Sequence, residues 1–231
     1  MINGIGIGII EIGLYILISA SIRKRFNVLN EINSITYYWL MMTILTGIWE
    51  SSYILNFGSI CNIAQDLINK NQHAWTNYYT LDYILPWNLA KIFYAEYGAY
   101  ADREYMTTSD DWSRTIESSH ALFCSVFSLL AIVYKIVSNG NEYLITLSIA
   151  MGSQFMNSLL YMANYFYQTH QKYSVNYDSP SFPCGPALTK RLFMWVNIFW
   201  LVFPAYTIAK YILDNQEKNL LYKYKSVTSI E

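Results

Sequence analysis

Four side chains with acid–base or thiol chemistry lie in or next to stretches that are otherwise apolar. Glu50 occurs in the segment TGIWESSYI, and Glu117, His120 and Cys124 follow at spacings of three and four residues. Residues three or four apart share a helix face, so Glu117 and His120 form a carboxylate and imidazole pair able to transfer protons. An ionisable group inside a membrane helix costs about 2.5–3.5 kcal/mol and marks function by default. We predict that Glu50, Glu117 and His120 are catalytic.

Structural alternatives exist for the Glu117 and His120 pair. Glu117 could compensate the dipole at the start of its helix, and His120 could be a polar packing residue. Glu11 lies in another apolar stretch, among isoleucines and a leucine. We expect Glu11 to pair with a neighbouring helix rather than to take part in chemistry.

Amides and aromatic rings recur at helical spacing around these groups. Gln154, Asn157, Tyr161 and Asn164 form a polar stripe, and Asn197 and Trp200 are three residues apart. A polar stripe of this kind commonly joins neighbouring helices. The faces of aromatic rings can in addition stabilise cations. A dry pocket of this kind would suit proton transfer through a carbocation, or binding of a cationic amphiphile. The residues that we predict to contact a substrate are Trp49, Tyr53, Asn157, Tyr161, Asn197 and Trp200.

These residues require a bundle of membrane helices to position them. The 231 residues are 54% hydrophobic and 13% charged, against about 25% charged in soluble domains. A bilayer core of roughly 30 Å needs about 20 apolar residues per helix. We predict an all-α integral membrane protein with five spans, at 3–22, 36–57, 116–138, 142–166 and 190–213.

The charge pattern sets an expected orientation and division of the chain. The basic loop Arg23–Arg25 should be cytoplasmic, and five spans then place the C-terminal lysines on the same side. We expect a helix and basic loop in 1–35, a four-helix membrane domain in 36–215 and a cytoplasmic tail in 216–231.

Two connecting segments carry local signals. The long loop 58–115 contains 84–101, where an early proline suits the start of an interfacial helix. Its end, TTSDDW at 107–112, offers caps for the third span. Prolines and a glycine in the loop 167–189 prevent helix and sheet alike and separate the last two spans.

Composition excludes several classes of partner. A net charge of −1 without a basic stripe argues against nucleic acid. Three cysteines without CxxC spacing indicate free thiols rather than a zinc site or a disulfide scaffold. We expect neither a metal nor an organic cofactor, and a homodimer is compatible with the sequence.

From about residue 41 to 213, the order of motifs resembles the emopamil-binding protein family, the sterol Δ8–Δ7 isomerases, within the wider EXPERA membrane domain. The segments that carry the resemblance are WNLAKIFYAEYGAYADREYM, WSRTIESSHALF, MGSQFMNSLLYMANYF and VNIFWLVFP. The last of these resembles the family pattern Met-Asn-x-x-Trp-Leu-Val-x-Pro. The order of the four is more specific than any one of them.

The resemblance implies a multi-pass protein of the endoplasmic reticulum that binds a sterol-like molecule and shifts its double bond. Glu50 and Glu117 match the family's two membrane glutamates. Asn197 and Trp200 match the pair that contacts the reacting region or cation-mimicking inhibitors.

Three positions depart from the isomerase pattern. Thr46 stands where the family has its catalytic histidine, and a hydroxyl is no proton donor near neutral pH. Asn157 stands where the isomerases carry an aspartate, and His120 where the family has a threonine. We hypothesise that the imidazole has moved to His120 and faces the same cavity.

Three functions follow as alternatives. The first is an isomerase in which Glu117 and His120 exchange protons, Glu50 assists and Trp200 steadies the carbocation. The second is a non-catalytic EXPERA protein, similar to the sigma-2 receptor type, that binds sterols or cationic amphiphiles. The third is an interaction protein whose polar residues only join helices.

Overall fold

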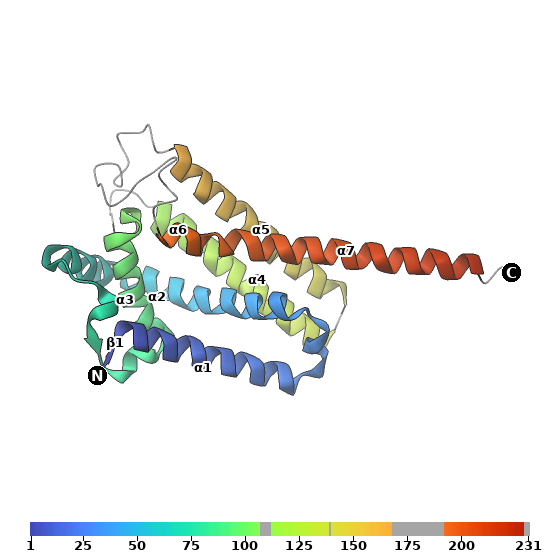
Figure 1. Ribbon diagram of the computed structural model, residues 1–231, viewed down its shortest axis with the longest axis horizontal. Helices are drawn as coiled ribbons and strands as arrows, with labels where there is room; N and C mark the ends of the chain where they lie inside the picture. The colour runs from blue at the N-terminus through green and yellow to red at the C-terminus, as the bar shows by residue number, and fades with distance from the viewer. Residues whose placement is uncertain (107–111, 139, 168–191, 229–231) are drawn as a thin grey trace.

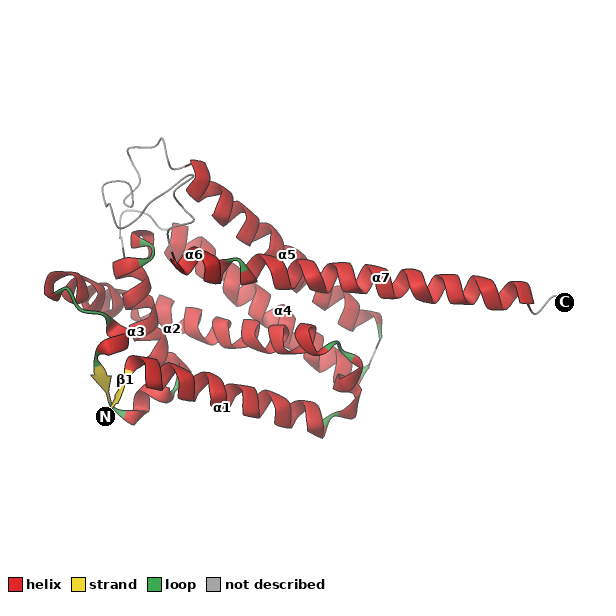
Figure 2. Cartoon of the chain, viewed as in Figure 1, coloured by secondary structure: helices red, strands yellow, loops and turns green. Residues whose placement is uncertain are grey.

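The computed structural model describes residues 1–106, 112–138, 140–167 and 192–228, and these are predominantly helical (Figures 1 and 2). The helices are α1 (Gly4–Arg25), α2 (Ser34–Lys70), α3 (Pro86–Tyr100), α4 (Ser118–Val137), α5 (Asn141–Tyr167), α6 (Leu192–Asn197) and α7 (Phe199–Thr228). Two short strands, β1 (Ile2–Asn3) and β2 (Tyr78–Tyr79), pair antiparallel near the N-terminus.

Three of the described helical stretches are long and apolar enough to cross a membrane, namely Gly4–Arg25, Arg114–Val137 and Trp195–Asp214. Large apolar side chains on α1 such as Ile9 and Leu17 are exposed, as a lipid-facing helix requires. The two other predicted spans fall in α2 and α5, which pack beside α4 in the same bundle but do not meet that criterion. Both carry polar residues such as Thr43 and Gln154 that turn inward.

Helix α2 is longer than predicted. The expected span ended at residue 57, next to a kink at Asn56 (φ −114°, ψ 16°), but helical structure resumes beyond the kink and continues to Lys70, where a loop was expected from residue 58. Residues 58–70 are too polar for a span, yet nothing in them breaks a helix, and Asn71 ends it in the left-handed conformation at φ 49°. At the other end, Asn33 caps α2 by accepting from the Ile35 amide at 2.9 Å.

The helix predicted within 84–101 is confirmed as α3, with Pro86 in its first turn. Its buried face packs against α2. There the Tyr53 ring centroid lies 4.8 Å from that of Tyr94 and 5.4 Å from that of Tyr105. This aromatic cluster fixes α3 across the end of the bundle.

Helix α1 is attached to α2 by polar contacts. The Trp49 indole donates to Glu11 Oε1 at 2.9 Å, which confirms the expected pairing of Glu11 with a helix neighbour. Tyr15 donates to the Met41 carbonyl at 2.8 Å, and Tyr37 donates to the Ser19 carbonyl at 2.6 Å.

The last predicted span is divided. Helix α6 ends at Asn197 and α7 begins at Phe199, so the interruption lies at Ile198, whereas Pro204 lies within α7. Helix α7 then continues to Thr228 and projects beyond the bundle (Figure 1), through most of the expected tail. The cap motif at 107–111, the loop at 168–189 and Cys184 lie outside the described residues.

Candidate functional site

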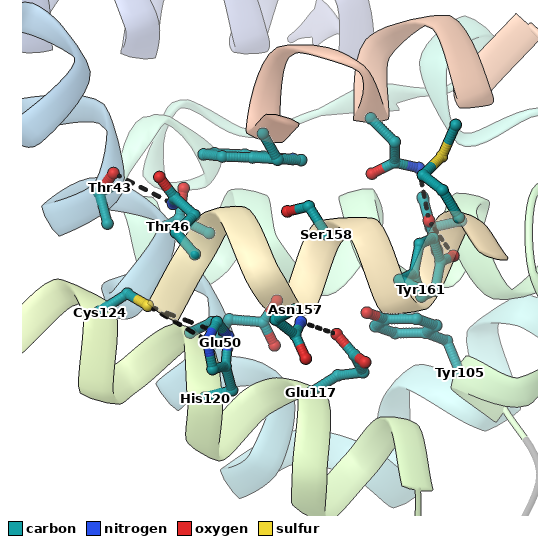
Figure 3. A pocket seen from close by; sticks show the side chains of 16 residues that line it. Thr43, Thr46, Glu50, Tyr105, Glu117, His120, Cys124, Asn157, Ser158 and Tyr161 are labelled. Atoms are coloured by element: carbon teal, nitrogen blue, oxygen red, sulfur yellow. Dashed lines mark hydrogen bonds between the residues drawn. The ribbon is translucent and has the colours of Figure 1, made fainter. Parts of the chain in front are cut away.

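One cavity of about 100 Å³ collects most of the predicted site. It lies between α2, α4, α5 and the α6–α7 junction, with α3 at one end (Figure 3). Seven of the nine predicted residues line it: Glu50, Glu117, His120, Asn157, Tyr161, Asn197 and Trp200. These residues come from α2, α4, α5, α6 and α7 and the turn before α4, so segments far apart in the sequence contribute to one cavity.

Glu50 reaches the cavity from the middle of α2 and is 6% exposed. The Tyr94 hydroxyl of α3 donates a hydrogen bond to its Oε1. Its Oε2 is buried and has no hydrogen-bond partner among the described residues. One carboxyl oxygen is therefore held in place by Tyr94, and the other is a buried acceptor.

Glu117 enters the same cavity from the start of α4. It ends the π-helical turn Trp112–Glu117 that leads into α4, a type of irregularity often found at functional sites. The Asn157 amide of α5 donates to Glu117 Oε2 at 2.8 Å (Figure 3). Glu50 and Glu117 are close enough to interact electrostatically.

The hydrogen bonds of His120 determine which ring nitrogen carries the proton. Nε2 lies 3.1 Å from the Ser153 carbonyl oxygen and 3.0 Å from the Ser153 hydroxyl. A carbonyl only accepts, so Nε2 is the donor, and Nδ1 keeps the lone pair that can accept a proton. Cys124 Sγ lies 3.4 Å from Nε2, which confirms that the two share a helix face (Figure 3).

We predicted that Trp49 and Tyr53 contact a substrate, but neither residue lines the cavity. Trp49 is the residue before Glu50 on α2, and its indole donates a hydrogen bond to Glu11 on α1. Tyr53 lies one turn beyond Glu50, where its hydroxyl donates to the Tyr105 carbonyl at 2.8 Å. The rings of α3 and Tyr105 fill the space that a substrate would need there.

A hydrogen-bonded chain that the sequence did not reveal forms one end of the cavity. Asn197 Nδ2 lies 3.2 Å from the Tyr97 hydroxyl, which is 2.9 Å from the Tyr161 hydroxyl. Tyr161 in turn donates to Asp102 Oδ2 at 2.9 Å, and Asp102 is fully buried. The spacing of Tyr94 and Tyr97 on one face of α3 was the available signal.

Aromatic rings and an amide side chain form the opposite end of the cavity. The rings of Trp200 and Trp39 lie 4.6 Å apart. Trp39 donates to Gln154 at 2.7 Å, and Gln154 donates to the Thr43 hydroxyl at 3.4 Å. Thr46 also lines the cavity, but its hydroxyl donates to the Met42 carbonyl of its own helix at 3.0 Å.

The groups that line the cavity are suited to proton transfer. Among the described residues, no group of three or more His, Cys, Asp or Glu side chains could hold a metal ion. Cys61 and Cys124 are free thiols. The cavity combines two carboxyl groups, one imidazole and an indole face.

No family model, curated protein or solved structure matches this chain. Functional assignment therefore rests on the site and on the motifs in the sequence.

Proposed function

We propose that this chain is an EXPERA-type membrane enzyme that shifts a carbon–carbon double bond in a sterol-like polycyclic substrate. The observation that carries the proposal is the convergence of Glu50, Glu117 and His120 on one cavity. These are the groups expected to move protons, and Glu50 lies 67 positions before Glu117 in the sequence.

The reaction needs one proton donor and one proton acceptor. An acid adds a proton to one alkene carbon and leaves a positive charge on its partner. Loss of a proton from the carbon beyond reforms the double bond one position along, so one proton enters, one leaves and no oxidant is needed. Glu117 and His120 take these two roles, and Glu50 assists them. The Trp200 face stabilises the cation.

The cavity has to widen for such a substrate. Small-molecule pockets occupy about 300–1,000 Å³, whereas this one has about 100 Å³. Asn197 and Trp200 flank the interruption at Ile198, and hinges commonly lie at helix ends. We expect movement there when a ligand binds.

The proposal includes five membrane spans and residence in the endoplasmic reticulum. The first, third and last spans correspond to the three apolar helices. The second and fourth are the inner helices α2 and α5, whose polar residues line the cavity. A span can carry polar groups when they face the interior of a bundle.

A second candidate is a non-catalytic protein that binds sterols or cationic amphiphiles in the same cavity. Thr46 favours it, because its hydroxyl bonds to its own helix at the position where the isomerases have a histidine. Two carboxyl groups and aromatic faces also suit an organic cation.

Expression in yeast that lacks sterol Δ8–Δ7 isomerase separates the two candidates. The enzyme restores Δ7 sterols, measured by mass spectrometry of the sterol extract, and a Glu117→Gln variant at equal membrane abundance does not. If the unaltered chain restores no Δ7 sterol while accumulating in the membrane, catalysis is rejected in favour of binding.

A further inference from the structure

We propose that a second cavity, at the other end of the bundle, binds the headgroup of a zwitterionic phospholipid. This cavity has about 450 Å³ and lies between the start of α2, the α4–α5 connection and the middle of α7. It shares no lining residue with the cavity that contains Glu50 and Glu117. Its volume falls within the range of about 300–1,000 Å³ for small-molecule sites.

The position of this cavity along the helices corresponds to the membrane interface. Lys135 lies near the end of the apolar stretch Arg114–Val137, and Asp214 ends the apolar stretch Trp195–Asp214. Asn33 caps the start of α2, just after the basic end of α1. Where apolar helices end, phospholipid phosphates begin, so the cavity lies at headgroup depth.

A buried lysine provides the first anchor. Lys135 is 8% exposed, and its Nζ lies 2.7 Å from Glu31 Oε2 and 5.3 Å from the centre of the Tyr143 ring. Lysine is almost never buried this far unless its charge is satisfied. Because Lys135, Glu31 and Tyr143 all line the cavity, this charge is presented to an occupant.

A second ion pair lies across the cavity on α7. Lys210 Nζ is 2.6 Å from Asp214 Oδ1, and both side chains are nearly half exposed. The lining therefore holds two lysines and two carboxylates and has no net charge.

This charge balance selects the ligand class. A lysine ammonium binds a phosphodiester by charge-assisted hydrogen bonds. An ammonium group of the ligand is matched by Glu31 and Asp214 and by the aromatic faces of Tyr143 and Tyr211. A phosphoethanolamine headgroup carries both signs and leaves the site neutral, whereas an anionic headgroup adds a negative charge that the two lysines, already paired with Glu31 and Asp214, do not offset. Leu144 and Leu147 line the cavity and offer apolar surface to acyl chains.

Native mass spectrometry of the delipidated full chain in detergent tests the assignment. We expect one phosphatidylethanolamine to bind, more tightly than phosphatidylglycerol. Soluble glycerophosphoethanolamine should bind far more weakly because it lacks acyl chains. Lys135→Gln and Lys210→Gln should each weaken the phosphatidylethanolamine complex about tenfold. Lys70→Gln is the matched control, because Lys70 forms the same i,i+4 pair with Asp66 at 2.6 Å elsewhere on α2.

Glu31→Gln tests the selectivity independently. Removing one carboxylate should shift the preference from phosphatidylethanolamine toward phosphatidylglycerol, while thermal unfolding verifies that the variant is folded. Lys210 is half exposed, so its variant is expected to fold even if the Lys135 variant does not. The proposal is overturned by equal loss in Lys70→Gln, by unchanged binding in Lys210→Gln, or by preference for phosphatidylglycerol in the unaltered chain. Equally tight binding of glycerophosphoethanolamine would reassign the cavity to a soluble ligand and also overturn it.

Discussion

At the scale of single residues, the cavity contains three groups able to move protons, each held by a different partner. Tyr94 donates to Glu50, the Asn157 amide donates to Glu117, and His120 donates from Nε2 to Ser153. Nδ1 of His120 and Oε2 of Glu50 remain as acceptors that these bonds do not use. The site therefore combines these two acceptors with the Glu117 carboxyl group around one small cavity.

Glu117→Gln is expected to lower isomerase turnover by about 100-fold or more. Glutamine keeps the side-chain shape and an oxygen that can accept from Asn157, but it cannot exchange a proton near neutral pH. Turnover is measured with the purified protein and a Δ8 sterol. Glu11→Gln is the matched control, because Glu11 is also a buried membrane carboxyl but does not line the cavity. Equal losses in the two variants would argue against a catalytic role for Glu117.

His120→Ala tests whether the imidazole replaces the histidine missing at Thr46. We expect a loss of about 100-fold or more in turnover, since His120 is the one histidine among the described residues that line the cavity. His73→Ala provides the comparison, because His73 pairs with Glu96 at 2.7 Å outside this site. Unchanged turnover in His120→Ala would remove His120 from the mechanism.

At the scale of elements, apolar runs and local signals predicted the existence of the helices more accurately than the residues at which they end. The proline at the start of α3 was sufficient to locate that helix. The continuation of α2 to Lys70 was missed because the prediction followed apolarity, and a helix can leave the bilayer without ending. Asn71, whose type tolerates a left-handed φ, was the unused signal.

The site was only partly predictable for a related reason. Periodicity within a helix placed Glu117, His120 and Cys124 on one face, and their proximity is confirmed. Contacts between helices, such as Tyr94 with Glu50 or Asn157 with Glu117, depend on rotation and register that no single segment encodes. Trp49 was predicted to contact a substrate, but its indole donates a hydrogen bond to Glu11 instead. Glu11 is on a helix outside the predicted membrane domain 36–215.

Close packing of α2 on α4 depends on Gly47. A Cβ at this position would overlap the side chain of Ser125, whereas one at Gly58 on the same helix would meet nothing. Gly47→Ala is expected to destabilise the fold by about 1–3 kcal/mol. Gly58→Ala should be neutral or stabilising by up to about 1 kcal/mol. Thermal unfolding in detergent compares them, and equal midpoints would refute close packing at Gly47.

At the scale of the whole molecule, the helix ends form two groups. The end of α1, the start of α2, the end of α4 and the start of α5 gather at one end of the bundle (Figure 1). The five crossings that we propose predict this arrangement, because each consecutive long helix would return to the opposite side. In the proposed topology, the basic end of α1 places the first group on the cytoplasmic side.

Single cysteines introduced at Lys24 and Asn141 test the five crossings, in a chain whose three native cysteines are replaced. With five spans, a membrane-impermeant thiol reagent reaches both from the cytoplasmic side and reaches a cysteine at Lys70 from the other. If only the three most apolar helices cross, α2 and α5 do not, and positions 24 and 141 are labelled from opposite sides.

The most direct test of the central claim is turnover of a Δ8 sterol by the purified protein in D₂O. Proton transfer through a carbocation requires one solvent hydrogen to enter the product at the protonated carbon. The account predicts a Δ7 sterol that carries one deuterium, detected by mass spectrometry, and no such product from Glu117→Gln. Binding of the sterol without conversion, or a Δ7 product without deuterium, would contradict it.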